Sequence, residues 1–193
     1  MYLTALRPLL LLFLLMFAGL GWTAVYAQVI PPPPQVPVRG YVLMDYQSGN
    51  LLADLKGDER MEPASITKLM TGYVIYQALK SGKIHLDDQV TISEKAWRTQ
   101  GSKMFIKIGS QVSVEDLLMG MVVQSGNDAT VALAEHVAGS EETFAKLMNQ
   151  EAERLGMKNS HFVNAPGMPD PNHYMSARDI AILSRAIIQE FPE

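Results

Sequence analysis

The stretch EPASITKLMT, Glu62–Thr71, opens a helix whose later half is apolar on nearly every side. Pro63 marks its start, because proline has no N–H to lose at the first helical position. We expect the helix to span Ala64–Leu79 and, since it is so apolar, to lie in the middle of the domain. Ser65 and Lys68 stand at i and i+3, so their side chains should be neighbours in the first turns.

Lys68 occupies a position that is unfavourable for a cation, because the positive end of the helix dipole costs it about 0.3–1 kcal/mol. Burial would also lower the pKa of the lysine and favour the neutral amine. A neutral amine can accept the proton of Ser65, whose hydroxyl is a weak nucleophile without such a base. Backbone N–H groups at the same helix end could hold an oxyanion. The S-x-x-K spacing also arises by chance, but its place behind a helix-starting proline favours acyl transfer through a covalent serine ester.

The rest of the pattern predicts a mixed α/β domain. A hairpin precedes the helix, with strands at 39–46 and 51–55 around a turn at 47–50. Two short strands are expected at 89–93 and 104–108. Capping serines and glycine stops delimit further helices: one from Ser113 through LLMGMVVQ, one through ATVALAEHVAG to Gly139, one from Ser140 to Gly156, and one that begins at Ser176. One hairpin is too little sheet to cover these helices, which suggests that more strands belong downstream.

A second polar element, QSGND at Gln124–Asp128, lies between two of these helices. In a purely structural interpretation, Gly126 closes one helix and Asn127 or Asp128 caps the next. In a functional interpretation, Ser125 supplies a proton-relay hydroxyl near Lys68, and Asn127 supplies an amide that binds substrate and holds the lysine. The pentapeptide alone is compatible with both.

The first 27 residues predict a secretory signal peptide. Arg7 provides the positive charge, LLLLFLLMFAGLGW the apolar core, and Val25 and Ala27 the small residues at the −3 and −1 sites of a cleavage point. An uncleaved membrane anchor is the alternative, but the apolar run is shorter than the roughly 20 residues that a span requires. Residues 28–38, with four consecutive prolines, predict a stiff linker, and residues 39–193 the domain.

Composition excludes several classes of function. The chain has no cysteine, so disulfides, thiol chemistry and thiolate zinc sites are ruled out. Its four histidines are scattered and form no HExxH motif, so we expect neither a catalytic metal nor a cofactor. A net charge of −4 with dispersed basic residues argues against a nucleic-acid partner. An exported enzyme or binding domain remains.

Together, S-I-T-K at 65–68 and S-G-N at 125–127 resemble the penicillin-recognising serine enzymes. The chain is most similar to the low-molecular-mass penicillin-binding proteins, the serine D-alanyl-D-alanine carboxypeptidases. The resemblance runs from about Tyr41 to the end and includes the later stretch NAPGMPDPNHYMSARDIA. It implies an α/β fold of the α+β type, β-lactamase/transpeptidase-like, in which an antiparallel sheet carries helices on both faces beside an all-helical subregion.

The resemblance also implies a role for each candidate residue. Ser65 would form the acyl-enzyme, Lys68 would accept its proton, and Ser125 would pass the proton to the leaving D-alanine. Asn127 would contact the peptide, and His173, in the loop before the last helix, would line the cleft. The substrate would be a peptidoglycan stem peptide that ends in D-Ala-D-Ala, and β-lactams would be covalent inhibitors. The protein would act in the periplasm, at the outer face of the cytoplasmic membrane.

The sequence departs from this family in one respect. The family carries a third element, K-T-G, on a sheet strand, and no K-T-G occurs here. In the family that element lies beyond the position of Glu193, together with the remaining strands and, in many members, a membrane-anchoring tail. We therefore expect a C-terminally truncated chain, in which the later sheet strands and any such anchor are missing.

Three alternative functions stay open at this stage. A class A β-lactamase also uses S-x-x-K, but it usually carries S-D-N and a glutamate-bearing loop, for which there is no convincing counterpart after Asn127. A related D-Ala endopeptidase is closer. From a different class, the chain could be an inactive wall-binding module that retains only the fold.

Overall fold

The computed structural model describes residues 32–33 and 35–192. The predicted signal peptide and residues 28–31 and 34 of the predicted linker lie outside the described residues. Contacts separate the chain at Gln35, and every helix and strand given below belongs to the second unit, Val36–Glu193. None of the described helices is long and apolar enough to cross a membrane.

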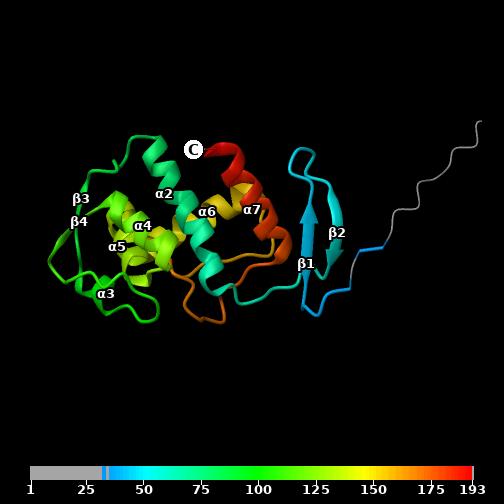
Figure 1. The fold of residues 1–193 in the computed structure, drawn as a ribbon, viewed down its shortest axis with the longest axis horizontal. Coiled ribbons are helices and arrows are strands. Elements are labelled where there is room, and N and C mark those ends of the chain that lie inside the picture. The colour runs from blue at the N-terminus through cyan, green and yellow to red at the C-terminus, as the bar shows by residue number, and fades with distance from the viewer. Residues whose placement is uncertain (1–31, 34, 193) are drawn as a thin grey trace, which may run out of the picture. The chain divides into compact units, whose positions relative to one another are not determined.

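The second unit combines helices with two antiparallel strand pairs, β1–β2 and β3–β4 (Figure 1). Its elements in chain order are β1 (Tyr41–Met44), β2 (Leu51–Leu55), the 3-10 helix η1 (Ala64–Thr67), α2 (Lys68–Lys80), β3 (Gln89–Thr91), α3 (Glu94–Arg98), β4 (Gln111–Ser113), α4 (Val114–Gln124), α5 (Asn127–Ala138), α6 (Glu141–Leu155) and α7 (Ala177–Glu190).

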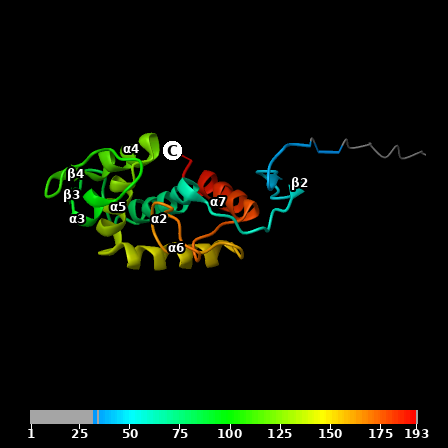
Figure 2. The same ribbon diagram turned by 90° about the horizontal axis from the view of Figure 1, so that it is seen from below.

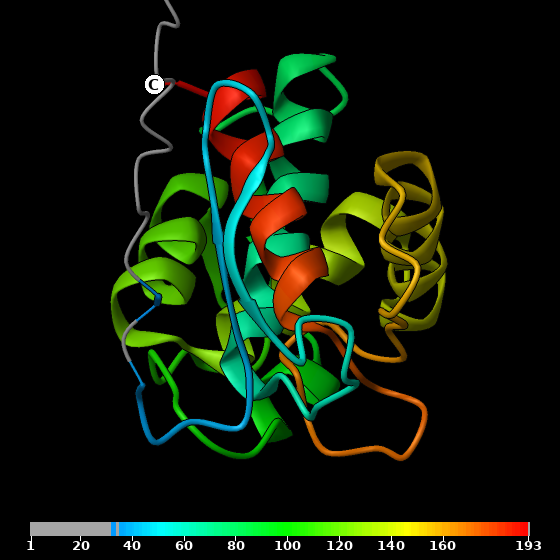
Figure 3. The ribbon, with the colours of Figure 1, turned by 90° about the vertical axis from the view of Figure 1, so that its right-hand side faces the viewer.

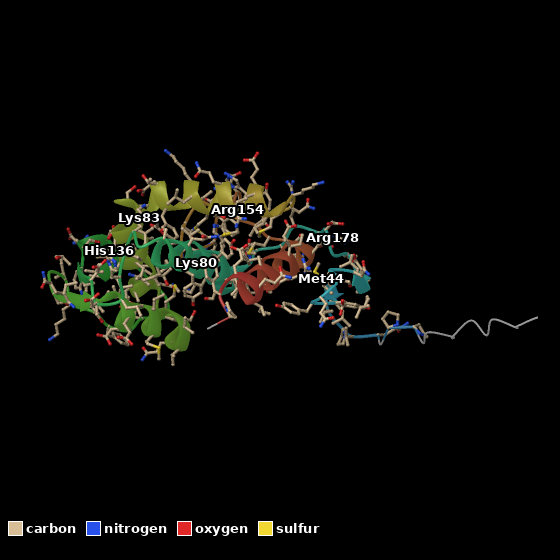
Figure 4. The ribbon with its side chains drawn as sticks, turned by 90° about the horizontal axis from the view of Figure 1, so that it is seen from above. Met44, Lys80, Lys83, His136, Arg154 and Arg178 are labelled. Atoms are coloured by element: carbon tan, nitrogen blue, oxygen red, sulfur yellow. The ribbon has the colours of Figure 1, made fainter. Side chains whose placement is uncertain are left out.

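Helix α2 is the centre of the core, as its apolar sequence predicts. It packs against α5, α6 and α7, and the view of Figure 2 shows α6 running below it. Met70, Tyr73 and Ile75 are fully buried. The Tyr73 hydroxyl donates to Glu190 of α7 at 2.7 Å and accepts from Arg154 of α6, whose side chain is labelled in Figure 4. A polar cluster therefore joins three helices around one buried phenol.

The predicted hairpin forms, with Tyr41 opposite Leu55 and a turn in which Asp45 accepts from the backbone N–H of Ser48. Helix α7 packs against β1 and lies directly behind the hairpin in Figure 3. Arg178, near the start of α7 and labelled in Figure 4, binds the carboxylate of Asp54 on β2 at 2.6 Å. The α+β class is confirmed, and within the described residues its sheet content consists of the two strand pairs.

Serine caps begin the helices at the predicted positions. The hydroxyls of Ser113, Ser140 and Ser176 each accept the backbone N–H of the third residue that follows, which satisfies one free donor of α4, α6 and α7. Short helix α3, which the sequence analysis did not predict, starts in the same way at Ser93. Such local caps involve only neighbouring residues, and for this reason the pattern reveals them well.

The prediction of a strand over 104–108 is wrong. This segment is irregular because its backbone N–H groups converge on the buried carboxylate of Asp128 instead of on a neighbouring strand. Met104 and Phe105 donate to that carboxylate at 2.9 and 3.0 Å, and Phe105 adopts a φ of 63°. The strand lies further on, at Gln111–Ser113, where it pairs with β3.

Candidate active site

The predicted nucleophile and base meet where η1 becomes α2. Ser65 lies within η1, and Lys68 is the first residue of α2, so the α-helix starts later than the sequence predicts. In a 3-10 turn the side chains at i and i+3 lie one directly above the other. Lys68 Nζ is 3.3 Å from Ser65 Oγ. Ser65 is an exposed residue, whereas Lys68 is 9% exposed.

The Lys68 amine lies among neutral oxygen acceptors. It donates to Oδ1 of Asn127 at 2.7 Å and to the backbone carbonyl of Pro166 at 3.1 Å. Within the part of the chain that the structure describes, no carboxylate forms an ion pair with it. Burial lowers the pKa of Lys68 to about 8. With this pKa, roughly a tenth of the lysine is the neutral amine at pH 7, the form that can accept a proton.

Asn127 reaches Lys68 because two contacts fix its own orientation. Its backbone N–H donates to the carbonyl of Ser102 at 2.7 Å, and its side-chain Nδ2 donates to the carbonyl of Gln100, also at 2.7 Å. With Nδ2 committed to Gln100, the amide oxygen faces the lysine. Asn127 is the first residue of α5, and the N-cap is Gly126 instead of Asn127 or Asp128, so the structural interpretation of these two residues is wrong. The predicted contact between Asn127 and Lys68 is present.

Ser125 is placed by an unusual backbone conformation. It ends α4 with φ 56° and ψ 33°, the left-handed region that non-glycine residues seldom adopt. The sequence analysis assigned the close of this helix to Gly126, which instead has an extended backbone and caps α5. Ser125 lines the same groove as Ser65 and Lys68, although the hydrogen bonds of Lys68 go to other groups.

The groove beside Ser65 has a volume of about 290 Å³ and a largely apolar lining. Its lining residues are Ser65, Lys68, Leu69, Gly72, Tyr76, Met121, Val122, Ser125 and Ile187. Leu69 is 38% exposed there, in contrast with the buried residues that follow it in α2. Among the described residues, no group of three or more metal-ligating side chains is positioned to hold a metal ion.

His173 lies elsewhere than the sequence analysis expects. It is 2% exposed, does not line the groove, and its Nε2 is 2.8 Å from the hydroxyl of Thr67 in η1. The backbone N–H of Val163 donates to its Nδ1 at 3.2 Å. Burial lowers the pKa of His173 below its ordinary value. The imidazole therefore lies behind the turn that carries Ser65, with both nitrogens bound within the protein.

Two contributions to the site come from the loop before α7 and were not anticipated from sequence. One is the Pro166 carbonyl that accepts from Lys68. The other is Gly167, with φ 88°, where a Cβ would lie 1.9 Å from the carbonyl oxygen of Ala64. Backbone carbonyls have no residue signature, so only the glycine in NAPGM could have indicated the close approach.

An exposed serine beside a buried, partly neutral lysine is the arrangement that general-base activation of a serine requires. The family model described as D-alanyl-D-alanine carboxypeptidase matches residues 27–193, and the chain belongs to this family. It is 49% identical to the D-alanyl-D-alanine carboxypeptidase DacA of Haemophilus influenzae over 187 residues, which are 94% of this chain and 48% of that protein.

Solved structures agree with this assignment. The chain superposes on penicillin-binding protein 5 of Haemophilus influenzae with a TM-score of 0.83 and 51% identity, covering 85% of this chain and 48% of that one. Penicillin-binding protein D2 of Listeria monocytogenes in its ampicillin-bound form gives a TM-score of 0.75 at 26% identity, over 84% of this chain and 66% of that one. The fold is therefore that of the penicillin-binding proteins, and the chain spans about half the length of the curated relative that it matches.

Proposed function

We propose that the protein is a serine DD-carboxypeptidase that removes the terminal D-alanine from peptidoglycan stem pentapeptides. The observation that carries this proposal is the environment of Lys68, whose amine is buried, lacks an acidic partner in the described chain, and lies 3.3 Å from the exposed Ser65 hydroxyl. Membership of the D-alanyl-D-alanine carboxypeptidase family supports the substrate class.

The geometry favours proton transfer from Ser65 to Lys68. A neutral amine has two N–H groups and one lone pair. If the N–H groups are donated to Asn127 and Pro166, the nearer acceptors at 2.7 and 3.1 Å, the lone pair is left for the Ser65 hydroxyl. The two acceptors thus orient the base as well as bind it, and the exposed serine oxygen is free to approach a carbonyl carbon.

Acyl transfer then proceeds in two steps. Ser65 Oγ bonds to the carbonyl carbon of the penultimate D-alanine as its proton moves to Lys68 Nζ. The C–N bond to the last D-alanine breaks, and that nitrogen takes the proton, with Ser125 as the relay. Water afterwards adds to the ester carbon, the bond between that carbon and Ser65 Oγ breaks, and Oγ takes up a proton that the water has lost, which releases the shortened peptide as a carboxylic acid. Backbone N–H groups at the start of η1 would stabilise the oxyanion of each tetrahedral intermediate.

The substrate and inhibitor classes follow from the same site. Asn127 holds Lys68, which lines the groove, and its amide would also contact the peptide backbone. The apolar lining suits a short peptide end that carries methyl side chains. The Listeria relative crystallised with ampicillin supports the proposal that β-lactams acylate Ser65. With a signal peptide at residues 1–27 and a linker at 28–38, residues 39–193 would act in the periplasm, at the outer face of the cytoplasmic membrane.

The decisive experiment is intact-mass spectrometry of the full chain after incubation with ampicillin, followed by peptide mapping. We expect one ampicillin adduct, on Ser65. It should vanish in Ser65→Ala and persist in Ser81→Ala, which removes an exposed serine at the other end of α2. Absence of an adduct, or an adduct on another residue, would contradict the proposal.

Substrate assays distinguish the carboxypeptidase from its relatives. A soluble pentapeptide ending in D-Ala-D-Ala should release free D-alanine, and Ser65→Ala should not release it. Cleavage of a cross-linked peptide dimer without D-alanine release from the pentapeptide would indicate an endopeptidase. Rapid loss of the ampicillin adduct with turnover of the drug would indicate a β-lactamase.

A further inference from the structure

The loop that precedes α7 lies against the back of the nucleophile turn along several residues. Thr71 donates its hydroxyl proton to the carbonyl of Ala165 at 2.7 Å. Gly167 approaches the carbonyl of Ala64 so closely that only a residue without a Cβ fits. The bond between His173 and Thr67 is the third contact, and it joins two buried side chains that are 106 positions apart.

The bonding of His173 defines its tautomer. Val163 presents a backbone N–H to Nδ1, and an N–H can only donate, so Nδ1 must carry the lone pair. In the neutral ring the proton then lies on Nε2, which donates to the Thr67 hydroxyl oxygen. Burial keeps the ring neutral by lowering its pKa, against the opposing effect of the nearby Asp170 carboxylate and together with the neighbouring His161. A second proton would face the N–H of Val163.

Thr67 is the link between this histidine and the chemistry. It lies two residues after Ser65 and immediately before Lys68, and it is fully buried. As the last residue of η1, it connects the turn that carries the Ser65 hydroxyl to the first residue of α2, which carries the amine. A buried threonine that has a fixed donor on its hydroxyl cannot rotate freely or move toward solvent without leaving that donor unpaired.

We propose that His173 is a positioning residue which, by donating from Nε2 to Thr67, holds η1 in the conformation that sets the Lys68 amine against Ser65. Its effect on the Lys68 environment stands on the geometry, and its effect on acylation rests on the proposed function. The competing explanation is that His173 matters only as a packed ring, since it also contacts Phe162 edge-on with 5.7 Å between the ring centroids. Variants that change one polar atom at a time separate the two.

Four variants of the full chain make the test. His173→Gln keeps a donor near the place of Nε2, whereas His173→Ala removes both polar atoms and the ring. Thr67→Val keeps the shape of the threonine without its hydroxyl, and Thr67→Ser keeps the hydroxyl. The first readout is the titration of Lys68, followed through the ¹³C signal of its Cε, which requires no catalysis. The second is ampicillin acylation, divided into a binding constant and a rate constant.

In the wild-type chain Lys68 should titrate near pH 8. Thr67→Val and His173→Ala should move the midpoint upward, toward that of an exposed lysine, and should slow acylation by about tenfold with little change in ampicillin binding. Thr67→Ser and His173→Gln, which keep a hydrogen-bonding group, should show nearly the wild-type Lys68 midpoint and the wild-type acylation rate.

Two outcomes would overturn the proposal. One is an unchanged Lys68 midpoint in folded Thr67→Val, and the other is an acylation rate that falls as far in Thr67→Ser as it does in Thr67→Val. If neither the wild type nor any variant is acylated, the proposed function is wrong. The titration of Lys68 would still show whether His173 positions the lysine, because it requires no catalysis.

Discussion

Nζ of Lys68 and Oδ1 of Asn127 are 2.7 Å apart, although the two residues are 59 positions apart in the sequence. The bond connects the first residue of α2 with the first residue of α5. Because an amide oxygen is neutral, it accepts a hydrogen bond from the lysine without forcing the amine to stay charged. Asparagine is thus suited to hold a lysine that has to act as a base.

Replacement of this amide by a carboxylate should disable the base. In Asn127→Asp the new negative charge lies at hydrogen-bond distance from Lys68 and favours its protonated form. We expect the Lys68 pKa to rise well above 8 and acylation by ampicillin at pH 7 to fall at least about tenfold, with partial recovery at high pH. The pH profile of the acylation rate measures both effects. A profile that keeps its wild-type midpoint would show that Asn127 does not tune the lysine.

The pH dependence of the wild-type protein follows from Lys68. Only the neutral amine accepts a proton, and its pKa is about 8. Below that value the acylation rate should fall by about tenfold per pH unit, and above it the rate should level off. Stopped-flow acylation between pH 5 and pH 10 tests this. Lys68→Ala should remove the dependence together with most of the rate, whereas Lys80→Ala, at the other end of α2, should retain it.

Gly167 should tolerate no side chain. A Cβ at this position would lie 1.9 Å from the Ala64 carbonyl oxygen, and the φ of 88° adds strain. We expect Gly167→Ala to lower the free energy of unfolding by more than the roughly 1 kcal/mol that strain alone costs, and to slow acylation as η1 is displaced. Urea unfolding and the acylation rate provide the measurements.

The matched control for this prediction is Gly82→Ala. Gly82 has a similar φ of 70°, but nothing lies within 4 Å of the Cβ that it would gain. Gly82→Ala should lower the free energy of unfolding only by the cost of backbone strain, and its acylation rate should match that of the wild type. Equal losses of stability in the two variants would contradict the inference that the loop touches the nucleophile turn.

Asp128 should be needed for the loop at 104–108. Its carboxylate accepts three consecutive backbone N–H groups, from Met104, Phe105 and Ile106, and is 1% exposed. Asp128→Ala would leave these donors unpaired, so we expect a loss of roughly 1–3 kcal/mol in the free energy of unfolding. Asp128→Asn, which retains one acceptor oxygen, should lower the free energy of unfolding by less than Asp128→Ala does. Faster amide hydrogen exchange confined to this loop would locate the effect, and unchanged exchange in Asp128→Ala would exclude it.

Sequence reasoning was most successful where structure depends on neighbours along the chain. The hairpin at 41–55, the caps at Ser113, Ser140 and Ser176, and the burial of α2 all appear as predicted. It failed at 104–108, because the groups that bind that backbone belong to a residue of another helix. It also missed the 3-10 form of η1, a turn that contacts the loop before α7 through Thr67 and Ala64.

For the candidate site, the sequence determined that Ser65 and Lys68 would be neighbours, since a spacing of three residues in any helical turn brings their side chains together. The tertiary structure alone decided that the amine is buried between Asn127 and Pro166, and that His173 lies behind the turn and not in the groove. The physical reason is that burial and long-range hydrogen bonds depend on which helices pack together, and it is burial that lowers the pKa of Lys68.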